Sequence, residues 1–171
     1  MGPLLPAFDA TTGCLPADPL FHDATVEEAR RAFVEAFIGL RRRPVLYTAY
    51  VACMEEFGRI LPGASYQQWL DGSFTTAELE PGDIDFVAFV PVAALRAASA
   101  AQRDTIRRLF RGAETPKGAP CHAFLVVNVP PGAPGELAMK LARAYFADLF
   151  GRQAEDKGGH PKGIVRLKVG G

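Results

Sequence analysis

Two aspartates stand at the start of an apolar run, and they limit the folds that the chain can adopt. The segment LDGSFTTAELEPGDIDFV, residues 70–87, contains Gly72-Ser73, nine further residues and then Asp83 and Asp85. The apolar flanks are typical of buried β-strands, in which an ionised carboxylate is costly unless a partner compensates it. Residues two apart in a strand share a face. The two carboxylates therefore lie side by side, and a cation or a proton has to offset their repulsion.

The rest of the chain alternates between helical and extended patterns. Apolar spacing predicts helices over 26–40, 44–61, 91–110 and 136–150, and strands over 66–70, 84–90, 121–129 and 162–169. Residues 1–24 contain four prolines and show no period, which predicts an irregular N-terminal arm. Residues 25–171 are expected to form a single α/β domain, in which a small mixed β-sheet packs against helices.

Charge and composition argue against several classes of protein. Nineteen basic residues balance nineteen acidic ones, so the overall charge gives no reason to expect a nucleic acid or a membrane as partner. No apolar run reaches the roughly 18 residues of a membrane helix, and the N-terminus lacks the pattern of a signal peptide. The three cysteines form no CxxC pair. We therefore expect a cytoplasmic protein with free thiols.

The loop between the two central strands suits a metal-bound phosphate. Mg²⁺ prefers oxygen ligands, commonly one or two carboxylates together with substrate phosphates. Gly72 lets a phosphate approach the backbone closely, and the Ser73 hydroxyl can donate to phosphate oxygens. We expect this turn and the aspartate pair to meet at one edge of the sheet. The simpler alternative is a loop with solvated carboxylates and a turn-forming serine.

Gly-Ser, nine residues and Asp-x-Asp together resemble the signature of the DNA polymerase β-like nucleotidyltransferase superfamily. The stretches LPAFDATTGCLP, DGSFTT, PGDID, AFLV and KGIVRL look like an uncharacterised bacterial family of short nucleotidyltransferase-like proteins. This resemblance covers nearly the whole chain. It implies a nucleotidyltransferase-like fold for residues 25–171.

The resemblance also implies an activity, the transfer of a nucleoside monophosphate from an NTP to an acceptor with release of pyrophosphate. The reaction would depend on Mg²⁺ or Mn²⁺, with Asp83 and Asp85 as the metal ligands. Gly72 and Ser73 would hold the β- and γ-phosphates. Thr75 is close enough in sequence to help hold phosphate.

Several other polar residues have two interpretations. Lys162 and Arg166 lie four apart in the last predicted strand, so they either face solvent or hold a triphosphate or an acceptor. The three arginines at 41–43 either form a solvated helix end or contact phosphate. Asp71 is expected to cap the turn before the Gly-Ser pair.

The superfamily resemblance leaves the acceptor open: an RNA end, a protein side chain or a small molecule. Short stand-alone nucleotidyltransferases often belong to toxin–antitoxin or defence systems, a setting that the resemblance permits. A single domain has little room for an acceptor-binding module. A protein partner, a homodimer or the N-terminal arm is therefore expected to contribute to acceptor recognition.

One feature departs from the superfamily pattern. Active members usually carry a third carboxylate on a later strand, whereas residues 121–129 contain neither Asp nor Glu. His122 occupies the expected place and can act as a general base near neutral pH, or it is a hydrogen-bonded surface residue. Asn128 is a second polar candidate on the same face. The alternative function is a catalytically inactive nucleotide-binding or protein-interaction module with the same fold.

Overall fold

Five strands form one mixed sheet in the computed structural model, which describes residues 5–170. Residues 1–4 of the expected arm and residue 171 of the expected domain lie outside the described residues. The strands are β1 (Phe21–Ala24), β2 (Tyr66–Asp71), β3 (Ile84–Pro91), β4 (Cys121–Asn128) and β5 (Ile164–Val169), in the spatial order β1-β5-β2-β3-β4. The outer pairs, β1 with β5 and β3 with β4, are parallel, and the others are antiparallel. The expected α/β class with a small mixed sheet is confirmed.

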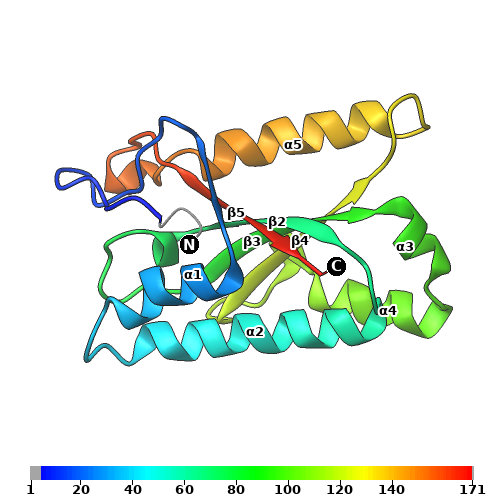
Figure 1. The fold of residues 1–171 in the computed structure, drawn as a ribbon, viewed down its shortest axis with the longest axis horizontal. Coiled ribbons are helices and arrows are strands. Elements are labelled where there is room, and N and C mark those ends of the chain that lie inside the picture. Colours follow the sequence, from blue (N-terminus) through cyan, green and yellow to red (C-terminus); the bar gives the residue numbers. More distant parts are fainter. Residues whose placement is uncertain (1–4, 171) are drawn as a thin grey trace.

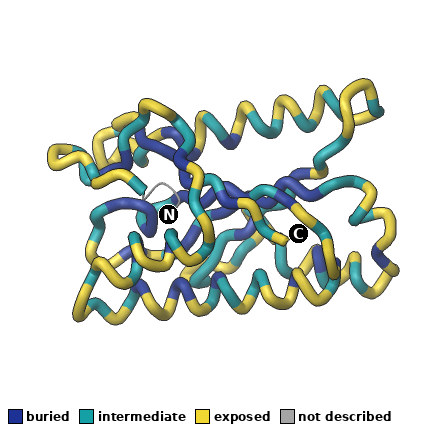
Figure 2. The backbone as a smooth tube through the Cα atoms, viewed as in Figure 1, coloured by how far each residue is buried: buried dark blue, intermediate teal, exposed yellow. Residues whose placement is uncertain are grey.

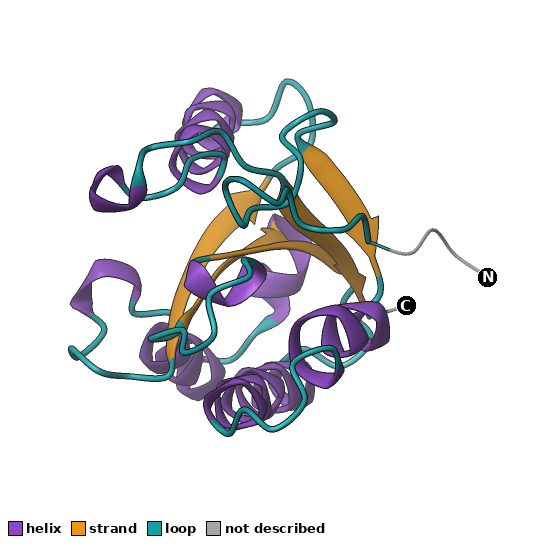
Figure 3. Cartoon of the chain, turned by 90° about the vertical axis from the view of Figure 1, so that its left-hand side faces the viewer, coloured by secondary structure: helices purple, strands orange, loops and turns teal. Residues whose placement is uncertain are grey.

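Helices cover both faces of this sheet (Figures 1 and 3). The helices are α1 (Val26–Arg30), α2 (Arg42–Ile60), α3 (Val92–Ala97), α4 (Ala100–Leu109) and α5 (Glu136–Phe150). On one face, Tyr50 of α2 packs in the same buried cluster as Phe86 of β3. On the other face, Phe146 of α5 packs with Trp69 and Phe89. The predicted helix over 136–150 has the same bounds as α5.

Both sides of β3 are buried, which explains its continuous apolar sequence. Phe86 faces the α2 side, while Val87 and Phe89 face α5, and all three are at most 1% exposed. Strands that are buried on both faces lose the usual alternation of polar and apolar residues. The carboxylates of Asp83 and Asp85 are tolerated because they lie at the start of this strand, where both residues are only partly buried.

The connection from β3 to β4 determines which residues meet at the site. These two strands are parallel, so α3 and α4 carry the chain back to the end of the sheet where β3 begins. The register pairs Asp85 with His122. Asn128 pairs with Pro91, about 20 Å further along the strand from His122 at 3.3 Å per residue.

The N-terminal segment differs from the expected irregular arm. It is irregular up to residue 20, but it ends in β1, so the expectation is wrong for Phe21–Ala24. Leu15 is 2% exposed and belongs to the core. The carbonyls of Gly13 and Leu15 accept hydrogen bonds from Ala77 and Gly163, at 2.7 and 2.9 Å. This segment therefore supports two loops that border the candidate site.

Two predicted helices are interrupted. The 26–40 helix stops as a regular α-helix at Arg30 and continues as a π-helical turn, Arg31–Glu35, where the carbonyl of Phe33 accepts a hydrogen bond from the Arg43 side chain. The 91–110 helix is divided between α3 and α4, because Ser99 caps the start of α4 by accepting from the backbone N–H of Gln102 at 3.2 Å. Within residues 5–170, none of the helices is long and apolar enough to cross a membrane.

Candidate functional site

The Gly72-Ser73 turn packs directly against the carboxylate of Asp85. Gly72 has φ +83° and ψ −172°, a backbone conformation that is essentially restricted to glycine. A Cβ atom at this position would lie 2.5 Å from Oδ2 of Asp85. Ser73 begins a short 3-10 helix, η2 (Ser73–Thr75), and its hydroxyl accepts a hydrogen bond from the backbone N–H of Gly82 at 3.3 Å. The turn thus requires glycine, and the serine joins the two ends of the loop.

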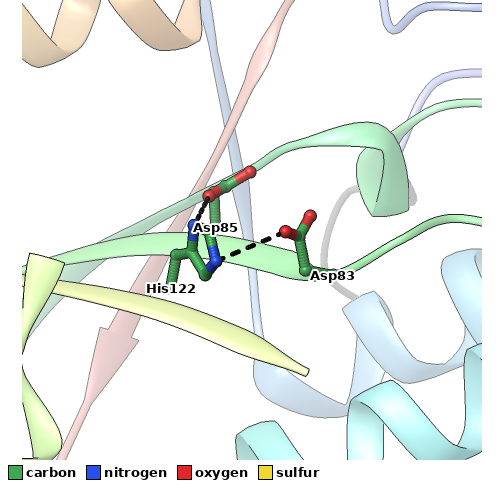
Figure 4. Close-up of side chains that lie close together, drawn as sticks. All are labelled: Asp83, Asp85 and His122. Atoms are coloured by element: carbon green, nitrogen blue, oxygen red, sulfur yellow. Dashed lines mark ion pairs between the residues drawn. The ribbon is translucent and has the colours of Figure 1, made fainter. Parts of the chain in front are cut away.

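Asp83, Asp85 and His122 form a cluster of possible metal ligands (Figure 4). Nε2 of His122 lies 3.6 Å from Oδ2 of Asp83, and Nδ1 lies 3.5 Å from Oδ1 of Asp85. One ligand atom from each residue lies within 4.8 Å of the others. Atoms bound to one ion at about 2.1 Å are separated by roughly 3–4 Å, so small movements would bring this set onto a common cation.

The surroundings of the cluster also fit a cation. Burial and the neighbouring Asp83 raise the pKa of Asp85 to about 6, although His122 and Lys162 act in the opposite direction. Among the described residues, the buried Nε2 atom of His122 has no hydrogen-bond partner. A bound cation would offset the repulsion between the two carboxylates and give this nitrogen a partner.

A buried ion pair lies beside the turn. Nζ of Lys162 is 2.6 Å from Oδ1 of Asp71, and the two side chains are only 5% and 8% exposed. The same Nζ donates to the carbonyl of Gly72 at 3.3 Å. Burial raises the pKa of Asp71 to about 7, against the opposing effect of Lys162.

The pair corrects two expectations. Lys162 does not share a strand face with Arg166, because it precedes β5 and is buried, whereas Arg166 pairs with Asp23 near the surface at 2.6 Å. Asp71 does more than cap a turn, since it is the counterion of Lys162. In the sheet, Asp71 of β2 lies opposite Asp85 of β3. The position of Asp71 directly before the Gly-Ser pair was the sequence feature that could have indicated its place in the site.

Arg43 holds the loop that contains the Gly-Ser turn. Its guanidinium is fully buried and donates to the carbonyls of Phe33 at 2.9 Å, Phe74 at 2.8 Å and Thr76 at 2.7 Å, and also to that of Glu78. Desolvation lowers the pKa of Arg43 to about 10. The expectation of a solvated helix end is therefore wrong for Arg43.

Its neighbour Arg42 holds the far end of the same loop. The Arg42 side chain donates to the carbonyls of Pro81 at 3.4 Å and Gly82 at 2.5 Å. The side chains of Arg42 and Arg43 therefore donate hydrogen bonds to backbone carbonyls of the protein itself. The local sequence does not distinguish this role from a contact with phosphate.

A pocket of about 530 Å³ opens beside these groups. Its charged lining residues are five acids and three bases: Asp71, Glu78, Asp85, Asp148, Glu155, Arg152, Lys157 and Lys162. Gly72 and Ser73 also line it, together with apolar side chains that include Phe124 and Leu149. Because its walls are partly charged and partly apolar, the pocket can receive a molecule with a charged end and a flat apolar end.

The other expected site residues lie around this pocket. Thr75 is 1% exposed and its hydroxyl donates to the carbonyl of Gly72 at 3.3 Å, so it supports the turn from inside and does not line the pocket. Asp83 and His122 lie next to Asp85 but outside the pocket lining. Asn128 is at the other end of β4. The structure thus brings together Gly72, Ser73, Asp85 and Lys162 at the pocket.

The chain matches one family model along most of its length. The model described as "Family of unknown function (DUF6932)" matches residues 6–168. The chain belongs to that family. Neither the curated proteins nor the solved structures contain a significant match to this DUF6932 member.

Proposed function

We propose that this DUF6932 protein is a metal-dependent nucleotidyltransferase-like protein that binds an NTP in the 530 Å³ pocket. The observation that carries the proposal is the packing of the Gly72-Ser73 turn against Asp85. This packing brings the Gly-Ser turn, which is the proposed phosphate site, and the cluster of candidate metal ligands to one end of the sheet. The Gly-Ser, nine-residue, Asp-x-Asp spacing supports the same proposal.

The proposed reaction is an in-line displacement at the α-phosphorus of the NTP. An acceptor oxygen forms a bond to this phosphorus while the bond to the bridging oxygen of the β-phosphate breaks, and pyrophosphate leaves. The proton of the acceptor passes to solvent. A bound divalent cation would neutralise charge on the phosphates during this step.

Asp83, Asp85 and His122 would hold that cation. Carboxylates suit Mg²⁺ and Mn²⁺, whereas an imidazole ligand favours transition metals over Mg²⁺. We therefore propose Mn²⁺ as the better-fitting ion and Mg²⁺ as the weaker one. In this role His122 is a ligand and takes the position of the third carboxylate.

The charge of the pocket makes the proposed binding depend on the cation. Five carboxylates and three cationic side chains line the pocket, and Asp83 lies next to it. A triphosphate would therefore meet a net negative surface without a metal ion. Lys162 is already engaged with Asp71, so its main role is to keep the Gly72 carbonyl and the turn in place.

A second candidate function is nucleotide binding without turnover. The observation that favours it is that β4 presents His122 opposite Asp85, where a carboxylate would be the stronger ligand for Mg²⁺. The two candidates share the binding site and differ only in whether pyrophosphate is released.

Thermal unfolding with each NTP and either Mn²⁺ or Mg²⁺ tests the binding. A ligand at about 100 times its dissociation constant adds roughly 2.7 kcal/mol to the free energy of unfolding, or about 5–10 °C for a domain of this size. The shift should vanish without metal and in the Asp83→Asn/Asp85→Asn variant.

A matched control removes two exposed carboxylates elsewhere, in the Glu56→Gln/Asp104→Asn variant, which should keep the full shift. No shift with any NTP in a protein that melts cooperatively would refute the proposal. If the shift appears, release of pyrophosphate in the presence of an acceptor distinguishes the transferase from the inactive binder.

A further inference from the structure

The outer side of α5 carries an apolar stripe. Leu137, Leu141, Tyr145 and Leu149 are 71%, 63%, 61% and 46% exposed. They recur every four residues and therefore form one ridge along the helix, and exposed positions recur along the length of α5 (Figure 2). Ridges of this kind interlock when two helices pack together. Four large exposed apolar side chains on one helix face indicate a surface that another protein covers.

The pattern of the stripe is nearly symmetric along α5. Leu137 and Leu149 are equally far from position 143, and so are Leu141 and Tyr145. A second α5 running in the opposite direction would therefore meet apolar side chains along the whole stripe. This is the property that a two-fold symmetric interface requires, because each copy presents the same patch.

The charges on the same face have the matching arrangement. Among the eight exposed positions of α5, only Lys140 and Asp148 are charged, and they have opposite signs. Each is equally far from Ala144, a small exposed residue that permits close approach of two helices. The centre of this charge pair lies one residue, or about 1.5 Å along the helix, from the centre of the apolar stripe at position 143, so one antiparallel pairing near Ala144 places Lys140 of each copy close to Asp148 of the other. Among the described residues of one chain, Lys140 pairs with Glu136 at 2.6 Å and Asp148 pairs with Arg152 at 3.4 Å, each four positions away along the sequence.

We propose that the α5 stripe is the interface of a homodimer, formed by antiparallel packing of α5 on α5 of a second copy. The interface extends to the candidate site, because Asp148 and Leu149 also line the 530 Å³ pocket. The antiparallel arrangement places the beginning of α5 from the second copy beside this end. Each pocket is then bordered by the partner subunit, which supplies surface that a single small domain lacks.

Sedimentation and light scattering of the full chain test the dimer without nucleotide or metal, so the result is independent of the proposed function. Wild type should have twice the chain mass of 18.4 kDa. Leu141→Glu/Tyr145→Glu should raise the dissociation constant by at least about 100-fold, because two apolar side chains would be replaced by like charges. Ile38→Glu/Val45→Glu, at residues that are 93% and 56% exposed elsewhere, should leave the dimer intact.

A charge reversal tests the orientation. Lys140→Glu alone should weaken the dimer about tenfold, and Lys140→Glu/Asp148→Lys should restore it. Circular dichroism establishes that each variant remains folded. A wild type with the mass of one chain at all concentrations overturns the proposal. An intact dimer in the Leu141→Glu/Tyr145→Glu variant also overturns the proposal. So does a Lys140→Glu/Asp148→Lys variant that dimerises no more tightly than Lys140→Glu.

Discussion

Gly72→Ala perturbs the turn, the metal cluster and the fold through one added methyl group. The backbone at Gly72 lies in a region that costs of order 1–3 kcal/mol for other residues. The new Cβ atom would also lie 2.5 Å from Oδ2 of Asp85, so the carboxylate or the turn has to move. We expect a loss of about 2–4 kcal/mol in the free energy of unfolding. The midpoint of thermal unfolding should fall by about 4–16 °C.

Gly82→Ala is the matched control, because Gly82 lies in the same loop, has no positive φ and leaves open space for an added methyl group. Urea unfolding followed by Trp69 fluorescence measures both variants, with a change of less than about 1 kcal/mol expected for the control. The stabilisation by Mn²⁺ should be lost in Gly72→Ala and kept in Gly82→Ala. Equal stability of the two variants would refute the reasoning about the turn.

Three further variants test the groups around the turn. Arg43→Met leaves the buried carbonyls of Phe33, Phe74 and Thr76 without their donor and should cost about 3–5 kcal/mol in urea unfolding. Lys162→Met leaves Asp71 buried without its counterion, at a cost of about 3 kcal/mol at pH 8. This cost should shrink at pH 5, because the raised pKa of about 7 means that Asp71 takes up a proton as the pH falls. His122→Asp replaces the imidazole with a carboxylate and should shift the preference of the site from Mn²⁺ towards Mg²⁺, measured by calorimetric titration with each ion.

Each of these expectations has a contrary outcome. Arg43→Lys offers one ammonium group for four carbonyls and should recover little stability, so full recovery would show that the fork geometry is unimportant. A pH-independent loss in Lys162→Met would contradict the role assigned to Asp71, and Lys162→Met/Asp71→Asn should recover part of the loss. Unchanged metal preference in His122→Asp would remove His122 from the ligand set.

The local elements could be predicted because their causes are local. The helix over 136–150 follows from apolar spacing, and the predicted strands over 66–70 and 84–90 each fall within one residue of β2 and β3. The neighbourhood of Gly72 and Asp85 also follows from local sequence, because one loop joins the two antiparallel strands that carry them. The ends of helices were less predictable where a side chain distant in sequence hydrogen-bonds to the backbone, as the Arg43 side chain does to the carbonyl of Phe33.

The sequence by itself determined the α/β class, the strand–loop–strand unit and the residue types of the candidate metal cluster and of the proposed phosphate turn. Only the tertiary structure decided which distant residues complete that unit. The contact of Asp71 with Lys162 joins positions 91 residues apart through the pairing of β2 with β5, and His122 reaches Asp85 through the parallel register of β3 and β4. Periodicity reports whether a residue lies on a buried or an exposed face. It carries no information on strand order, and strand order determines which buried charge meets which partner.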